Sequence, residues 1–242
     1  MKNTMTIAAK EFKSYLTSPM AYVVIAVFLL GTGFFFAIFP TSSAVTYAST
    51  SLSGLFGNVY YVVILLLLLA LLTMRLLAEE RKMGTIELLL TAPVRDSEIV
   101  VGKFLGGLGI LVIMLVLTLY HPLLLRIFGD PDVGPMATAY LGLLLMGSAA
   151  LAIGIFASSL TSNQIVAAVV AGGILLGLWF LGYISSALPT TLQNVVGYFS
   201  LSNYFPDFVK GVIDTRGVIY YLSVTVLFLF MAIRSLENSR WN

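Results

Sequence analysis

The chain has 242 residues, of which 59% are hydrophobic and only 10% are charged, and its mean hydropathy is +1.00. A soluble domain is nearer a quarter charged, so this composition excludes a water-soluble globular protein and indicates that lipid surrounds most of the chain. The net charge is only +2, and there is no cysteine, which excludes disulfides and thiolate metal sites. The first apolar run is too long for a signal peptide and lacks a small-x-small cleavage site.

Six apolar runs are long enough to cross a bilayer, which takes roughly 20 residues of helix. The runs are continuous, whereas the strands of a membrane barrel would alternate in polarity, so we expect an all-α bundle. We therefore predict a single transmembrane domain over residues 1–242, with spans at 20–39, 56–74, 104–125, 136–160, 165–188 and 218–233.

The residues before the first span predict an amphipathic helix. Apolar side chains recur there at spacings of three and four, and cationic and hydroxyl side chains take the other face. The apolar set is Met5, Ala8, Phe12, Tyr15 and Leu16, and the polar set is Lys10, Lys13, Ser14 and Thr17. Such a helix over 1–18 is suited to the inner membrane interface, and the alternative is a short cytoplasmic tail. Ser18-Pro19 indicates a break and a new helix start.

The segment 75–103, between the second and third spans, concentrates ten charged residues in a chain that is otherwise poor in charge. Gly84 frees the backbone and Pro93 forbids helix continuation, so 85–91 is expected to form one or two helical turns. Asp96 is expected to cap the next helix. Leucines flanked by both charge signs suit docking on a soluble protein. The alternative is a solvated loop whose leucines lie on lipid headgroups.

Lysine and arginine are retained on the cytoplasmic side of membranes, so their distribution orients the spans. With the N-terminus inside, the inner segments hold ten basic residues, which are Lys2, Lys10, Lys13, Arg75, Arg81, Lys82, Arg95, Lys103, Arg234 and Arg240. The outer segments hold three, which are Arg126, Lys210 and Arg216. Both termini and the 75–103 loop are therefore predicted to be cytoplasmic.

The spans offer little for ion-coupled transport, which needs ionisable groups in the membrane. No Asp, Glu, Lys or Arg lies between Asp132 and Asp207, and the first two spans are also uncharged. His121, next to Pro122, is either a proton relay or a hydrogen-bonded imidazole at a helix kink, and we favour the kink.

Small residues mark candidate helix-packing faces. The pairs Gly102/Gly106 and Gly173/Gly177 have the spacing that lets membrane helices approach closely. Gly142, Gly147 and Gly154 in the fourth span are further candidates, and generic glycine content is the alternative. The segment 187–216 is rich in aromatic residues, and it predicts short outer-surface helices that serve either as an anchoring belt or in substrate exit.

Several runs of the chain resemble type 2 ABC transporter permeases, and the subgroup that they resemble most is the gliding-motility-associated permeases. The runs are LTMRLLAEE at 72–80, GTIELLLTAPV at 84–94, IVVGK at 99–103, SPMAY at 18–22, GVID at 211–214 and LE at 236–237. The resemblance implies an N-terminal elbow helix, a cytoplasmic coupling helix between spans two and three, outer helices between spans five and six, and a dimer of permeases.

The resemblance also implies that the coupling segment contacts a separate ATP-binding subunit. By this resemblance, the residues of this chain that are expected to form the contact are Glu79, Glu80, Arg81, Lys82, Gly84, Thr85, Ile86, Glu87, Leu88, Leu89, Leu90 and Pro93. The chain has no G-x-x-x-x-G-K-[ST] phosphate loop, so it is not expected to be an enzyme or to bind a cofactor. ATP and Mg are expected on two copies of the partner.

The function that follows from the resemblance is the permease subunit of an ATP-driven exporter in the bacterial inner membrane, without a nucleic-acid partner. Two other classes stay open. The chain could transmit force to a periplasmic or motility machine without net transport, or it could be a passive structural subunit with no ATPase partner.

Overall fold

The computed structural model describes residues 2–38, 56–85, 94–128 and 132–238. Every regular element in these ranges is a helix, which confirms the all-α expectation. In chain order the helices are α1 (Lys2–Thr17), α2 (Pro19–Ile38), α4 (Val59–Thr73), α5 (Ala78–Lys82), α7 (Asp96–Leu117), α8 (Tyr120–Phe128), α9 (Val133–Ser159), α10 (Gln164–Ser185), α11 (Thr190–Tyr198), α12 (Phe205–Val209) and α13 (Thr215–Asn238).

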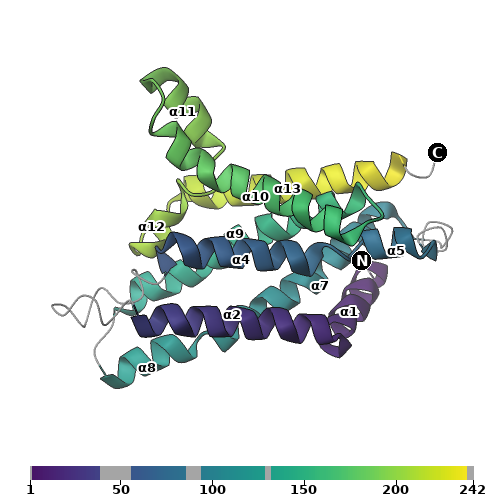
Figure 1. The fold of residues 1–242 in the computed structure, drawn as a ribbon, viewed down its shortest axis with the longest axis horizontal. Coiled ribbons are helices and arrows are strands. Elements are labelled where there is room, and N and C mark those ends of the chain that lie inside the picture. The colour runs from purple at the N-terminus through teal and green to yellow at the C-terminus, as the bar shows by residue number, and fades with distance from the viewer. Residues whose placement is uncertain (1, 39–55, 86–93, 129–131, 239–242) are drawn as a thin grey trace.

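Six helical segments of the described chain are long and apolar enough to cross a membrane (Figure 1). They are Pro19–Ala37, Val59–Lys82, Asp96–Ile127, Val133–Ser159, Gln164–Ser185 and Thr215–Asn238. The prediction of six spanning helices is therefore confirmed, and the chain is a multi-pass membrane protein. Three of the segments run past their apolar runs, since the second continues to Lys82, the third begins at Asp96 and the sixth continues to Asn238.

Helix α9 forms the centre of the bundle and packs against α4, α7, α10, α12 and α13. Two of its glycines bring neighbouring side chains close to its backbone. A Cβ added at Gly142 would lie 2.7 Å from Cβ of Phe208, and one at Gly147 would lie 2.6 Å from Cδ2 of Leu111. Both distances are too short for carbon atoms in contact, so Phe208 and Leu111 would have to shift if these positions of α9 carried side chains.

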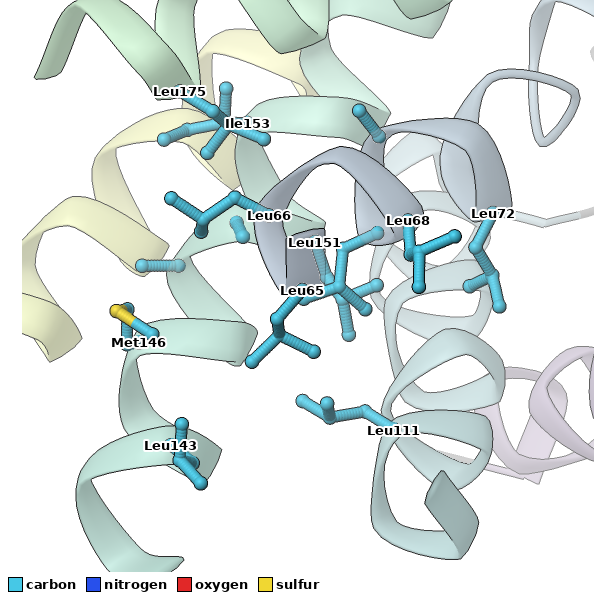
Figure 2. Close-up of a cluster of buried hydrophobic side chains, with 14 of the residues drawn as sticks. Leu65, Leu66, Leu68, Leu72, Leu111, Leu143, Met146, Leu151, Ile153 and Leu175 are labelled. Atoms are coloured by element: carbon cyan, nitrogen blue, oxygen red, sulfur yellow. The ribbon is translucent and has the colours of Figure 1, made fainter. Parts of the chain in front are cut away.

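Leucine is the commonest residue of the hydrophobic core, and a large part of that core lies where α4, α7 and α10 meet α9. Figure 2 shows side chains from α4, α7, α9 and α10 pointing toward one another. The labelled members are Leu65, Leu66, Leu68, Leu72, Leu111, Leu143, Met146, Leu151, Ile153 and Leu175, and all of them are buried. Lipid tails are as apolar as leucine, so van der Waals packing, rather than exclusion from water, holds these helices together.

The third span is interrupted between α7 and α8, and His121 lies at the interruption. Pro122 has no N–H to offer the carbonyl of Thr118, the residue four positions earlier. The imidazole Nδ1 of His121 lies 3.0 Å from that carbonyl oxygen, and the hydroxyl of Tyr140 donates to it at 3.0 Å. The His121 side chain is fully buried. These contacts favour the kink interpretation of His121 over the proton relay.

The start of α7 corrects the capping expectation. The residue that precedes the helix in extended conformation is Arg95, and Asp96 is the first helical residue. The backbone amide of Arg95 donates to Oε2 of Glu98 at 3.1 Å. A glutamate at the third helical position can reach back to the amide before the helix, and Glu98 takes that role here.

The two ends of the bundle carry different elements. Figure 1 places α1, α5 and the end of α13 at one end of the bundle, and α11 and α12 at the other. Helix α11 extends away from the spans in this view. Helix α1 packs against α7, but Met5 and Leu16 of the predicted apolar face are exposed. The residues that meet the glycines of α7 include Ile7, Glu11 and Phe12.

Candidate functional site

The second span breaks shortly before it ends, and one serine satisfies the backbone groups that the break exposes. Helix α4 stops at Thr73, and α5 begins at Ala78. The buried hydroxyl of Ser158 in α9 accepts hydrogen bonds from the amides of Leu77 and Ala78, each at 3.0 Å, and donates to the carbonyl of Met74 at 2.9 Å. A hydroxyl has one donor and two acceptor positions, so its hydrogen-bonding capacity is filled. The direction of α5 is thereby fixed by α9.

The same junction is closely packed. A Cβ added at Gly154 of α9 would overlap the side chain of Thr73, the last residue of α4. The hydroxyl of Thr73 donates back to the carbonyl of Leu69 in its own helix at 2.9 Å. Helix α4 therefore lies directly on the α9 backbone at its last residue, where the break begins.

Helix α5 is also held on a second side, by an ion pair to Lys103. The ammonium Nζ of Lys103 in α7 lies 2.7 Å from Oε1 of Glu80 and 2.8 Å from Oε1 of Glu11 in α1. The Lys103 side chain is 2% exposed, and those of Glu11 and Glu80 are 15% and 20% exposed. One buried cation thus joins α1, α5 and α7.

Two further contacts fix α1 to the end of the second span. The hydroxyl of Tyr15 donates to the carbonyl of Leu72 at 2.9 Å, and Nη1 of Arg75 donates to Oγ of Ser18 at 2.7 Å. The Arg75 guanidinium also lies over the Tyr15 ring, 5.1 Å from its centroid. Burial is the main cause that raises the pKa of the Tyr15 hydroxyl far above its ordinary value, so this group stays a donor at physiological pH.

The predicted packing pair Gly102 and Gly106 faces α1. A Cβ added at Gly102 would lie 2.7 Å from Cγ2 of Ile7, and one at Gly106 would lie 2.7 Å from Cβ of Glu11. The close approach brings Glu11 within reach of Lys103. The other predicted pair, Gly173 and Gly177, has no atom of the described chain within 4 Å of an added Cβ.

Beyond α5 the chain turns outward. Lys82, Met83, Gly84 and Thr85 are all exposed, and Gly84 adopts a positive φ of 69° that favours glycine. The amide of Gly84 donates to the carbonyl of Arg81 at 3.2 Å, which ends the helix. The chain therefore leaves α5 through a defined turn at the end of the bundle.

The described residues include half of the predicted contact set. Glu79, Glu80, Arg81 and Lys82 lie in α5, and Gly84 and Thr85 follow in the turn. The helix predicted over 85–91 lies, apart from its first residue, outside the described residues. So do six members of the set, which are Ile86, Glu87, Leu88, Leu89, Leu90 and Pro93.

Three residues that anchor the site were not singled out from the sequence, namely Glu11, Lys103 and Ser158. From the sequence, Lys103 was only one of the ten basic residues on the inner side and the last residue of the run at 99–103. Its partners lie 92 and 23 positions away, and Ser158 is 80 and 81 positions from the amides it binds. The only sequence signal for Lys103 was a lysine directly before the third apolar run.

The polar surfaces around the site are hollowed in two places. A cavity of about 240 Å³ lies between α1 and α5 and is lined by charges of both signs, among them Lys10, Arg75 and Glu79. A groove of about 950 Å³ lies between α5, α9 and the end of α13, with Arg81 and Arg234 in its wall. No cluster of potential metal ligands occurs in the part of the chain that the structure describes.

A comparison with protein families agrees with this geometry. The model of the family described as ABC-2 family transporter protein matches residues 5–238, which is nearly the whole chain. A comparison with curated proteins gives no match. In ABC-2 transporters the permease is the membrane component, and ATP hydrolysis takes place on a separate ATP-binding subunit. The chain therefore belongs to the ABC-2 transporter family and is a membrane permease subunit of an ABC transporter.

Proposed function

We propose that the ATP-binding subunit drives this permease through segment 84–93, at the end of the bundle that carries α1 and α5. The observation behind the proposal is the anchorage of α5, which Ser158 and Lys103 hold from two sides just before the exposed turn at Gly84. A contact surface that is fixed to the spans can pass a displacement to them, whereas a loose loop would absorb it.

In this proposal the docking end is the cytoplasmic end, in the inner membrane of a bacterium. The distribution of basic residues supports the orientation, with ten on the proposed inner side and three on the outer side. Figure 1 shows α1, helix α5 and the end of α13 at one end of the bundle, as six crossings require, so one orientation applies to all three.

ATP and Mg are proposed to bind two copies of the ATP-binding subunit, and the closure of that pair would displace both 84–93 segments. A second permease, either a copy of this chain or a related one, would complete the pathway. Helix α10 offers a face for it, since added Cβ atoms at Gly173 and Gly177 meet nothing within 4 Å.

Export of an amphipathic, lipid-like or weakly charged substrate is the proposed activity. It is supported by the absence of Asp, Glu, Lys and Arg from 133–206, because uncharged spans suit such a substrate and disfavour ion coupling. The direction and the assignment to the gliding-motility-associated subgroup rest on the resemblance of the runs at 72–80, 84–94 and 99–103.

A second candidate function is force transmission to a protein on the outer side without net transport. The observation that favours it is α11, which extends away from the spans at the end opposite α5 (Figure 1). Leu192, Val195 and Tyr198 on this helix are exposed and offer an apolar contact surface. A flux assay in vesicles separates the two functions, since force transmission predicts binding of an outer partner during ATP turnover while no candidate solute moves.

The docking proposal is tested by co-purification of the ATP-binding subunit with variants Glu87→Ala and Leu89→Ala. We expect both variants to lose most of the bound subunit while the permease itself purifies normally. Leu192→Ala, an exposed leucine at the opposite end, is the matched control and should retain it. Full retention by both docking variants would contradict docking through this segment. Failure of the unaltered permease to bind any nucleotide-binding subunit would instead favour a passive structural role.

A further inference from the structure

The ion triad of Glu11, Glu80 and Lys103 joins α1, α5 and α7 at a single point. Lys103 lies in the first turns of α7, Glu11 in the middle of α1, and Glu80 in α5. The two N–O distances, 2.8 and 2.7 Å, are those of charge-assisted hydrogen bonds. Glu80 lies four residues before Gly84, so it is close to the point where the chain turns outward.

Stability alone does not explain such a triad. Burying an ammonium and two carboxylates costs solvation free energy, and well-packed apolar replacements of buried ion pairs are often neutral or stabilising. Buried charges of this kind are better attested as devices that fix the register of the elements they join. Lys103 meets this description, because its side chain is 2% exposed and both of its partners come from other helices.

The contacts around the triad divide into two groups. Ser158 fixes α5 to α9, in the centre of the bundle. Tyr15 and Arg75 fix α1 to the end of α4. The triad connects α1 with α5 through Lys103, beside the cavity of about 240 Å³ that lies between the two helices.

We propose that Lys103 is a positioning residue that makes α1 move together with α5. A displacement of segment 84–93 would reach α1 through Glu80, Lys103 and Glu11, and would shift a helix that packs along α7. The inference rests on the proposed function, since it assumes that the segment is displaced by the ATP-binding subunit. Its structural part, the linkage of α1 to α5, can be tested on the permease alone.

The first experiment measures the linkage by electron paramagnetic resonance. The chain has no cysteine, so spin labels at Lys10→Cys and Met83→Cys report only these two sites, which are exposed and line the cavity from opposite sides. In the permease in lipid nanodiscs we expect a narrow distance distribution that broadens in Lys103→Met and in Glu80→Gln. Glu237→Gln is the matched control, because it breaks an exposed ion pair within α13. Unchanged distributions in both triad variants would overturn the proposed linkage.

The second experiment measures ATP hydrolysis by the complex in phosphatidylethanolamine–phosphatidylglycerol liposomes. Lys103→Met should co-purify with the ATP-binding subunit as the unaltered permease does, but hydrolyse ATP roughly fivefold more slowly. A bismaleimide bridge between Lys10→Cys and Met83→Cys should leave turnover intact in the otherwise unaltered chain and restore it in Lys103→Met. If Lys103 served only in folding, the bridge would not restore ATP hydrolysis in Lys103→Met.

Two results would overturn the inference. The bridge could arrest turnover, which would show that α1 and α5 must move apart. Lys103→Met could instead form the complex and hydrolyse ATP at the unaltered rate. Loss of the complex in the unaltered permease is a different result, because it contradicts the proposed function and leaves the linkage to be judged by the spectroscopic distances.

Discussion

The hydroxyl of Tyr15 donates a hydrogen bond of 2.9 Å to the carbonyl oxygen of Leu72. Leu72 lies in the last turn of α4, where helical carbonyls lose their intrahelical partners. The amide of Leu76, which would have continued the ladder to Leu72, bonds to Thr73 at 3.1 Å instead. A side chain of α1 therefore satisfies a carbonyl that the break in the second span leaves open.

Replacing Tyr15 by phenylalanine removes this donor and keeps the ring under Arg75. The carbonyl of Leu72 is then left without a partner in a buried position. We expect Tyr15→Phe to lower the free energy of unfolding by about 1 kcal/mol, measured in detergent by thermal unfolding. Tyr22→Phe is a matched control, since the Tyr22 hydroxyl donates to the carbonyl of Leu16 at an exposed site. An equal loss in both variants would contradict a special role for the buried contact.

Replacing Ser158 by alanine should loosen α5. The change leaves the amides of Leu77 and Ala78 and the carbonyl of Met74 without the hydroxyl that binds them. We expect faster amide hydrogen exchange over 77–82 and a loss of about 2 kcal/mol in stability. Exchange in this stretch at the unaltered rate would show that the junction does not depend on the serine.

The matched control for Ser158→Ala is Ser186→Ala. The hydroxyl of Ser186 donates only to the carbonyl of Tyr183, within the same turn and at an exposed site. This variant should leave exchange at 77–82 unchanged, because Ser186 lies at the end of α10 and away from α5 in the fold.

Glycine substitutions should distinguish the two predicted packing pairs. A methyl group at Gly106 would lie 2.7 Å from Cβ of Glu11 and 3.3 Å from the carbonyl oxygen of Ala8, so α1 would have to move away. We expect Gly106→Ala to destabilise the permease by about 2 kcal/mol. Gly177→Ala should not destabilise the single chain, because its methyl group meets nothing within 4 Å. Equal thermal stability of the two variants would contradict the packing of α1 on α7.

The sequence was sufficient to predict the spans because each one is a continuous apolar run. A long apolar run is all that a helix needs in order to cross a bilayer. It also indicated that the helix before Met20 exists and that Gly84 would mark a turn. The helix breaks were harder to predict. Pro122 signals a kink, but the break lies at Thr118 and Leu119, where the Thr118 carbonyl accepts from the amide of His121 and the hydroxyl of Tyr140 in place of the amide that Pro122 lacks.

The anchorage of the site could not be predicted from the sequence, for a physical reason. Lys103, Glu11 and Ser158 act through partners far away in the chain, and local periodicity carries no information on such pairs. Glycine spacing was equally ambiguous. Gly102 and Gly173 each begin the same four-residue pattern, but only Gly102 has a neighbouring helix against it in the single chain.

Docking of the ATP-binding subunit at segment 84–93 requires that this subunit touch the turn after α5. A photo-crosslinking amino acid placed at Met83, which is exposed beside Gly84, tests this in the intact membrane. The matched position is Tyr198, exposed at the end of α11 on the opposite side. We predict that illumination joins the ATP-binding subunit to position 83 and not to position 198. Crosslinking of that subunit to position 198 would contradict docking at the turn after α5. A lack of crosslinking to either position, in a membrane that contains both proteins, would contradict it as well.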